Sequence, residues 1–494
     1  MAIKRYIAEA DNTITNAFEA NLIKRATKAN MGAADVLETF VIHGQTSSSI
    51  SADNAEEARI IIQFPVSGTN AAIETIHRDR NNNKIPPQGK VSFYLRIFNA
   101  AHAETTPEDF DLDVKIISKT WNEGRGLDMD TYSDIGFSSF LSSSSGSAWS
   151  SPGGDFHSAV DTDNFSASVN FKHGFEDIEL DVTTAVENWI DGTKANYGFL
   201  LKHVASSLSG NNGTLYTKKF FARTSEFFFR RPVIEARWDD SRKDHRGSFF
   251  ISSSLLDQTD NINRLYLYNR FRGQLKNIPG LKNNKLKVGI FPNVSESAQT
   301  VVSSSGASVT SIEASRLFEN GIHVTGVYTC SFASTLTASI LHDVWFTGST
   351  TFHTGSFRPK NPQAQEFDES STYVNSIRNL KSTYRPKDRP RLRIYARPKD
   401  WSPTIYSVAS KKIETSLIED AYYKVVRVTD DIEAVPYGTG SDNQTRTSYD
   451  VSGNYFDLDM SLLEPGYSYG IKLTYYLLGE YQEQAEMFKF RVDE

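Results

Sequence analysis

The sequence of 494 residues contains one cysteine, Cys330, and only 5 methionines. A single cysteine excludes an internal disulfide framework and any metal site built from several cysteines. Cys330 lies in an alternating stretch, where we expect a small buried residue and not a nucleophile. Phenylalanine and tyrosine are plentiful, with 31 and 22 residues. Because aromatic residues favour strands, the composition already indicates an all-β protein.

The sequence also lacks an excess of positive charge and long apolar runs. It has 53 Lys and Arg against 60 Asp and Glu, which gives a net charge of −7. A weakly acidic chain is a poor candidate for nucleic-acid binding, which requires a basic surface. No stretch approaches 18 apolar residues, so we expect no membrane insertion. No apolar segment follows the first residues, so we expect no secretory signal and folding in a cytoplasm.

Motifs that carry catalysis are missing as well. No pair of the 10 histidines has the His-Glu-x-x-His spacing of zinc proteases. Neither a phosphate-binding Gly-x-x-x-x-Gly-Lys-[Ser/Thr] loop nor a Gly-x-Ser-x-Gly nucleophile motif occurs. Paired carboxylates for glycoside hydrolysis need only be close in space, and no pair stands out in the sequence. The sequence therefore predicts a protein that is not an enzyme, with no catalytic residues and no cofactor.

Two oxygen-rich stretches resemble calcium ligands in composition. They are residues 161–164 and the group of Asp79 with the asparagines at 81–83. Neither has the spacing and closing glutamate of an EF-hand loop. We therefore interpret both as solvated loops and predict no metal site.

Period-two alternation of apolar and polar residues recurs along the chain and predicts strands. The clearest predicted strands are 58–64, 91–97, 112–117, 178–182, 198–202 and 231–238. One segment, 183–190, instead places Val186, Trp189 and Ile190 on one helical face. We expect a short helix there that packs Trp189 against a sheet.

The sequence predicts three tandem β-sandwich domains, at 1–240, 247–368 and 373–494. A charged segment, 239–246, separates the first two. In the last, the pattern Leu-x-Pro-Gly-x-x-Tyr at 463–469 is typical of the tyrosine corner of immunoglobulin-like and fibronectin-type sandwiches. The last two domains share the pattern Arg-Leu-x-aliphatic-Tyr-x-Arg, at 264–270 and 391–397. This match leaves both an internal repeat and coincidence open.

Two apolar features are candidates for contact with other molecules. The serine-rich stretch 138–152 is predicted to be a long loop, with Trp149 as its anchor to the body of the domain. Phe227, Phe228 and Phe229 are predicted to lie on a strand, where three consecutive side chains cannot all enter one core. We expect at least one to face outward as an interface patch, or to be buried under a loop or another domain.

Residues 8–238 resemble the DNRLRE-type β-sandwich, a module tied to carbohydrate binding and cell-surface proteins. The matching residues occur in the order of that family: Ala10-Asp11, Asn30-Met31-Gly32, Ile60 to Phe64, Trp121-Asn122-Glu123, Trp149, Gly153-Gly154, Leu180 to Thr183, Val186, Trp189, Gly192, Asn196 to Leu201 and Lys219 to Arg223. The serine-rich loop and an insertion at 78–87 depart from the pattern. The resemblance implies a jelly-roll-like sandwich at the N-terminus and supports the fold more than sugar binding.

The whole chain also resembles virion structural proteins of contractile-tailed, T-even-like marine bacteriophages. The stretches that carry this resemblance are 13–18, 397–406, 436–443 and 452–457. It implies a non-enzymatic structural or adaptor protein of the tail, baseplate or neck, located in the virion after synthesis in the host cytoplasm. Its partners would be other virion proteins and copies of itself. The alternative is a virion protein that binds host surface glycans, with Trp149 as the first residue to consider.

Overall fold

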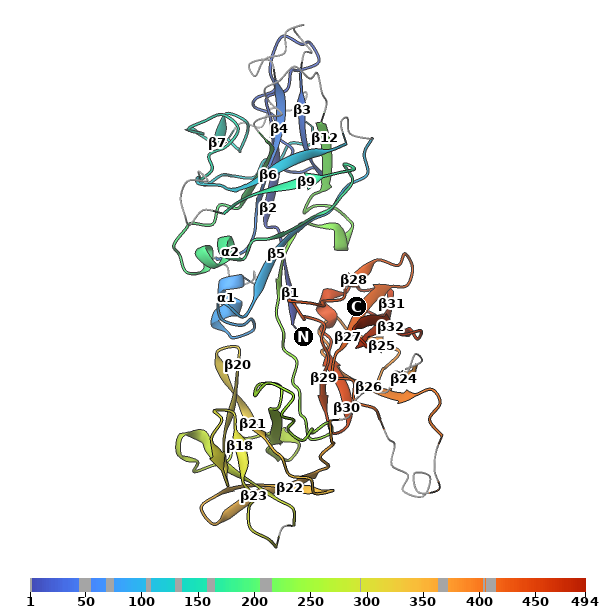
Figure 1. The fold of residues 1–494 in the computed structure, drawn as a ribbon. Helices are drawn as coiled ribbons and strands as arrows, with labels where there is room; N and C mark the ends of the chain where they lie inside the picture. Colours follow the sequence, from blue (N-terminus) through green and yellow to red (C-terminus); the bar gives the residue numbers. More distant parts are fainter. Residues whose placement is uncertain are drawn as a thin grey trace. The chain divides into compact units, whose positions relative to one another are not determined.

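The computed structural model describes residues 2–43, 55–67, 75–103, 108–128, 136–157, 165–204, 216–293, 295–362, 372–402, 405 and 415–494. The chain divides into two compact units, Ile3–Trp238 and Asp239–Glu494 (Figure 1). We call them the first and the second unit. The finer division at 247–368 and 373–494 stays a prediction.

The first unit is built from two main antiparallel sheets and a small hairpin. The smaller sheet has the order β1 (Ile3–Ile7), β13 (Val233–Arg237), β5 (Ser92–Ile97), β10 (Ile178–Asp181). The larger sheet has the order β12 (Tyr216–Phe221), β3 (Val36–Ile42), β4 (Glu56–Gln63), β11 (Phe199–His203), β6 (Phe110–Ile116), β9 (Ser166–Phe171), with β2 (Ala10–Thr15) paired to β4. The hairpin is β7 (Ser142–Ser144) with β8 (Ser147–Ala148), and two helices complete the unit, α1 (Ile76–Asn81) and α2 (Thr183–Ile190).

The second unit contains three larger sheets and one short hairpin. The first sheet has the order β19 (Ser308–Val309), β18 (Val301–Ser303), β21 (Ile322–Ala333), β20 (Ile312–Glu319), β17 (Lys285–Phe291), β22 (Leu341–Thr347), β23 (Thr350–Phe357), with β14 (Asn263–Tyr268) paired to β21. The second has the order β24 (Tyr373–Ile377), β26 (Arg391–Pro398), β30 (Gly453–Asp457), β29 (Ser448–Asp450). The third has the order β25 (Thr383–Tyr384), β33 (Phe488–Val492), β31 (Ser468–Leu477), β27 (Ala421–Arg427), β28 (Glu433–Val435), with β32 (Glu480–Glu483) paired to β31. The hairpin is β15 (Arg270–Phe271) with β16 (Gln274–Leu275), and 3₁₀ turns lie at η3 (Lys282–Asn284) and η4 (Met460–Leu462); a further 3₁₀ turn, η2 (Phe228–Arg230), belongs to the first unit.

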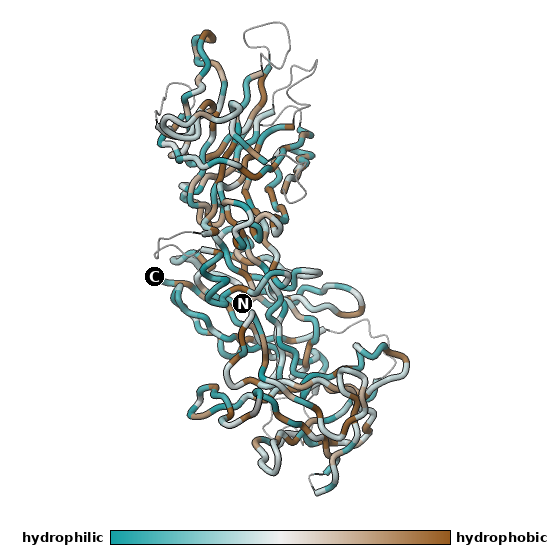
Figure 2. Tube along the Cα trace, turned by 90° about the vertical axis from the view of Figure 1, so that its left-hand side faces the viewer, coloured by the Kyte–Doolittle hydropathy of each residue, from teal (hydrophilic) through white to brown (hydrophobic). Residues whose placement is uncertain are grey.

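The predicted all-β class is confirmed, with several sandwich-like sheets. Hydrophilic and hydrophobic residues are interspersed along the chain (Figure 2), and many of the strands form where the two kinds alternate. In β5, Phe93, Leu95 and Ile97 are fully buried, whereas Ser92 and Tyr94 are only half-buried. Such alternation gives a strand one face to place in the core.

The predicted helix is confirmed as α2, and it packs Trp189 against the larger sheet of the first unit, as predicted. The Asp181 carboxylate accepts a hydrogen bond from the Thr183 N–H at 2.8 Å, and Gly192 follows the helix with a φ of 80°. Trp189 packs on Phe199 of β11, with ring centroids 5.0 Å apart. The helix therefore covers part of the core of the first unit.

The second unit shows the predicted tyrosine corner. The Tyr469 hydroxyl, at the start of β31, donates a hydrogen bond to the Glu464 carbonyl at 2.7 Å. Tyr469 is fully buried, and Gly466 adopts a φ of 90°. The bond fixes the chain where it enters β31.

Three local predictions are wrong. Phe228 and Phe229 lie in the 3₁₀ turn η2 and not on a strand; Pro232, which has no backbone N–H to donate to a sheet, stands between this turn and β13, which begins at Val233. The serine-rich stretch contains the hairpin β7–β8 in addition to loop. Asp79 is a fully buried residue of α1 that bonds Lys4 and Tyr6, and does not lie in a solvated loop. The predicted loop at 161–164 lies outside the described residues.

Candidate functional site

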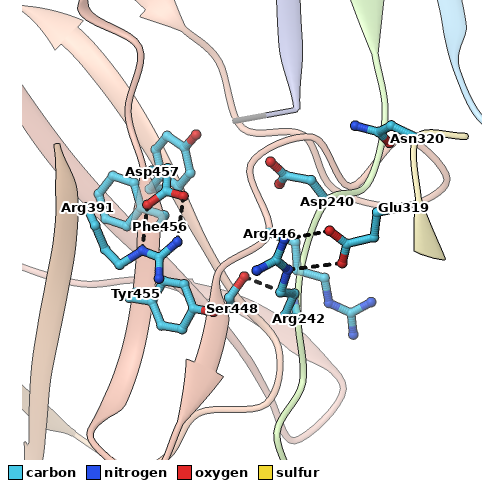
Figure 3. Close-up of a pocket in the computed structure, with 11 residues that line it drawn as sticks. Asp240, Arg242, Glu319, Asn320, Arg391, Arg446, Ser448, Tyr455, Phe456 and Asp457 are labelled. Carbon is cyan, nitrogen blue, oxygen red and sulfur yellow. Dashed lines mark hydrogen bonds and ion pairs between the residues drawn. The ribbon is translucent and has the colours of Figure 1, made fainter. Parts of the chain in front are cut away.

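A cavity of the second unit is lined by charged pairs. It has a volume of about 140 Å³. Figure 3 shows two arginine–carboxylate pairs in it. Arg242 Nε and Nη2 lie 3.0 and 2.5 Å from the two Glu319 oxygens. Arg391 Nε and Nη2 lie 2.8 and 2.9 Å from the two Asp457 oxygens. Such two-point pairing fixes the orientation of both partners.

The arginines come from segments far apart in the sequence. Arg242 belongs to the charged segment 239–246, which runs beside β29: its N–H donates to the Ser448 hydroxyl at 2.9 Å and its carbonyl accepts from the Tyr449 N–H at 2.9 Å. Glu319 ends β20, so the pair joins this segment to the sheet of β14–β23. We call the Arg242–Glu319 and Arg391–Asp457 pairs together the arginine clamp.

The pKa values of Arg242, Arg391 and Asp457 in the clamp are shifted in favour of their charged forms. Burial opposes the charge of Arg242, but the hydrogen bonds to Glu319 outweigh it and raise the pKa of the guanidinium. The hydrogen bonds that Arg391 donates to Asp457 likewise raise the pKa of Arg391. Burial raises the pKa of Asp457, yet Arg391 holds it below its usual value. The paired groups therefore stay charged and satisfy one another, which suits a structural joint better than proton transfer.

A second pocket, of about 650 Å³, lies in the first unit beside the serine-rich stretch. We call it the Phe156 pocket; it is lined by Ser118, Lys119, Ser150, Ser151, Gly154, Asp155 and Phe156. The Phe156 ring is half-buried, with Lys115 Nζ 5.7 Å and Lys202 Nζ 5.5 Å from its centroid. An aromatic ring beside hydroxyl, carboxylate and ammonium groups is a set that can bind a polar ring.

Asp155 is held in its ionised form at the wall of this pocket. Its two oxygens accept hydrogen bonds from the Ser150 and Ser151 N–H groups at 2.9 and 3.0 Å. Burial opposes the charge, but these backbone N–H groups prevail and lower the pKa of Asp155. The carboxylate is therefore an acceptor at neutral pH, and Lys119 adds a positive charge nearby.

Trp149 is buried and anchors the serine-rich stretch, as predicted. It is 5% exposed and packs with Ile61, Ile117 and Leu200. Its indole N–H donates to the Ser139 carbonyl at 2.8 Å. Trp149 thus offers no exposed ring face on which a sugar could stack. Phe156, which the sequence did not single out, is a half-buried aromatic residue in this region.

Of the three consecutive phenylalanines, Phe227 is exposed, whereas Phe228 and Phe229 are partly buried. Phe227 is 51% exposed and contacts Phe221 edge-on, with centroids 5.4 Å apart. Phe228 and Phe229 are half-exposed or less and pack on each other at 5.1 Å. Whether they form an interface stays a prediction.

Several residues that carry the DNRLRE resemblance meet in one partly buried hydrogen-bond network. Glu123 Oε1 accepts from the Asp11 N–H at 3.0 Å and from Arg223 Nε at 2.7 Å. The Asp11 carboxylate accepts from the Arg223 N–H at 2.6 Å. Nearby, the Asn30 side chain accepts from the Gly126 N–H at 2.9 Å. This network links β2 to the chain after β6 and β12, so these residues have a structural role here.

Sequence reasoning missed the clamp and the Phe156 pocket. The alternation of acids and bases in 239–246 was a signal that the segment has ionic partners. The partners Glu319 and Asp457 carry no such signal, because only the fold brings them to it. Among the described residues, no group of three or more His, Cys, Asp or Glu side chains converges as a metal site would require. No helix in the described part of the chain is long and apolar enough to span a membrane.

Comparison with known proteins gives no family. No family model matches the chain, and no curated protein matches it. Among solved structures, a marsupial T cell receptor is 8% identical, with 47% of this chain and 68% of the receptor chain covered and a TM-score of 0.16. The FN1–FN3 domains of chicken CNTN1 are 9% identical, with 60% and 87% covered and a TM-score of 0.15. A Salmonella alpha-2-macroglobulin is 7% identical, with 94% and 26% covered and a TM-score of 0.15. Scores this low support no argument about function.

Proposed function

We propose that the protein is a non-enzymatic structural or adaptor component of a bacteriophage virion, in the tail, baseplate or neck. The arginine clamp is the observation that carries the structural part of this proposal. Each arginine of the clamp donates two hydrogen bonds to its partner carboxylate, and these pairs join distant segments of one unit. The virion context rests on the sequence resemblance to tailed-phage structural proteins.

The architecture supports the same role. Each unit has its own buried core. In the second unit, one buried cluster contains Trp345, Tyr328 and Leu265. Units that are stable by themselves can present loops and strand edges to neighbours without refolding. Copies in a symmetric particle would then reuse the same contacts.

Mass spectrometry of purified particles tests this proposal. We expect peptides of this chain in particles that remain intact through density-gradient purification, at a constant ratio to the major tail proteins. A chain found only in the lysate, and not in purified particles, would overturn the proposal.

The alternative, a glycan-binding virion protein, is favoured by the Phe156 pocket. Asp155, Ser150 and Lys119 surround a half-buried aromatic ring there. A glycan array with the full chain tests it. We expect Phe156→Ala to abolish any hit, whereas Leu141→Ala, at an exposed residue of the neighbouring stretch, should leave it unchanged. An array without hits, or equal loss in both variants, contradicts this alternative.

A further inference from the structure

Strand β23 is an unusually long and uncharged sheet edge. It spans eight residues, Thr350–Phe357, and pairs on one side with β22. Its sequence, TTFHTGSF, contains no Lys, Arg, Asp, Glu or Pro. Natural proteins usually protect a long edge with charge, proline or cover, because its free N–H and C=O groups invite another strand.

Other edge strands of the described sheets are protected or short. Most of the other edge strands that are longer than two residues contain a charged residue. These strands are β1, β2, β10, β12, β14, β28, β29 and β32. In β24, the Asn375 N–H and side chain bond Glu486 and Gln484. Strand β9 also carries no charged residue, but it is shorter, with six residues. With eight residues, β23 is the longest described edge, and it carries neither charge nor proline.

Side chains on both faces of β23 are solvent-exposed. Residues 350–354 and Ser356 are exposed, and only Phe357 is buried. A bulge at Phe352 interrupts the pairing with β22, after which residues 353–357 pair regularly. Position 355 has no room for a side chain, since a Cβ there would lie 2.5 Å from an Asp343 oxygen of the neighbouring strand β22. The regular segment 353–357 is thus an edge without acid, lysine or arginine, in which the small residues Thr354, Gly355 and Ser356 lie between His353 and the buried Phe357.

We propose that β23 pairs antiparallel with β23 of a second copy of this chain. A two-fold contact places each strand against itself, so a charged edge would set like charges opposite one another. The eight residues of β23 carry no acid and no lysine or arginine, and so meet their own copy without that cost. The small residues Thr354, Gly355 and Ser356 also allow close approach of the two backbones. Continuous pairing across the two copies gives each edge strand the hydrogen-bonded neighbour it lacks.

This pairing deepens the proposed function by naming the surface through which copies meet, but it is measured on the isolated chain. Light scattering after size exclusion should show a dimer of the full chain at micromolar concentration. Thr354→Lys should raise the dissociation constant about tenfold or more, because it adds like charges within one interface. Ser308→Lys, an equally exposed position on the short edge β19 of the same sheet, should have no effect.

Crosslinking locates the contact. Because Cys330, the one cysteine of the chain, is buried, Thr354→Cys adds the one accessible thiol. A short bismaleimide should join two copies of that variant, and should not join copies of Ser308→Cys. A monomer at all concentrations, a dimer that Thr354→Lys leaves intact, or binding of only a foreign strand would each overturn the proposal. None of these results would bear on whether the chain is found in purified particles.

Discussion

Folding buries the carboxyl group of Asp11. It is fully buried, and its carboxylate accepts a hydrogen bond from the Arg223 N–H. Burial raises the pKa of Asp11 to about 7, although the Arg223 N–H and guanidinium act in the opposite direction. The folded state therefore binds this proton more tightly than the unfolded state, whose carboxyl titrates near its ordinary value of 3.8.

A pH dependence of stability follows at Asp11. Between about pH 4 and pH 7 the folded state holds more protons, so this group makes the protein less stable as pH rises through that window. The effect is roughly 1.4 kcal/mol for each unit of pKa shift. In urea unfolding from pH 4 to 7, Asp11→Asn, which keeps an acceptor for Arg223, should remove that part of the slope. Equal slopes for the wild type and Asp11→Asn would contradict this.

At the scale of elements, Trp149 decides whether the serine-rich stretch is ordered. Trp149→Ala removes a buried ring and its bond to Ser139, which should destabilise the first unit by about 3–5 kcal/mol. Leu141→Ala, at a side chain that is exposed, should cost under about 0.5 kcal/mol. Thermal unfolding and proteolysis within 138–152 measure both. Equal stability of the two variants would mean that Trp149 does not anchor this stretch.

The tyrosine corner offers a matched pair two residues apart. Tyr469→Phe removes only the hydroxyl that bonds the Glu464 carbonyl, so we expect a loss of about 1–2 kcal/mol. Tyr467→Phe, at an exposed ring, should change the free energy of unfolding by less than about 0.5 kcal/mol. Denaturant titration of the full chain compares them. A loss at Tyr467→Phe as large as that at Tyr469→Phe would argue against a special role for the corner.

The elements themselves were largely predictable from sequence. Alternation predicted β4, β5, β6, β10, β11 and β13, and the spacing of Val186 and Trp189 predicted α2. The phenylalanine turn was missed because three consecutive aromatic residues favour a strand by propensity, whereas the chain forms the turn η2 there before β13 begins at Val233. The clamp was missed because Arg242 and Glu319 are 77 residues apart and meet only through the fold.

At the scale of the second unit, the arginine clamp should contribute to cooperative unfolding. Arg242→Gln leaves Glu319 without its two-point partner and should cost about 1 kcal/mol, the upper end for a partly exposed ion pair, because the pairing is two-point. Lys285→Gln breaks an exposed pair with Glu313 and should cost under about 0.5 kcal/mol. Calorimetry resolves the two variants. A cost for Arg242→Gln no greater than that for Lys285→Gln would remove the clamp as support for a structural role.

The structural role is tested most directly by an electron cryomicroscopy map of the intact phage particle. We predict density for both β units in several symmetry-related copies, each in contact with neighbouring particle proteins. A complete map in which no density fits either unit would contradict a structural role in the virion.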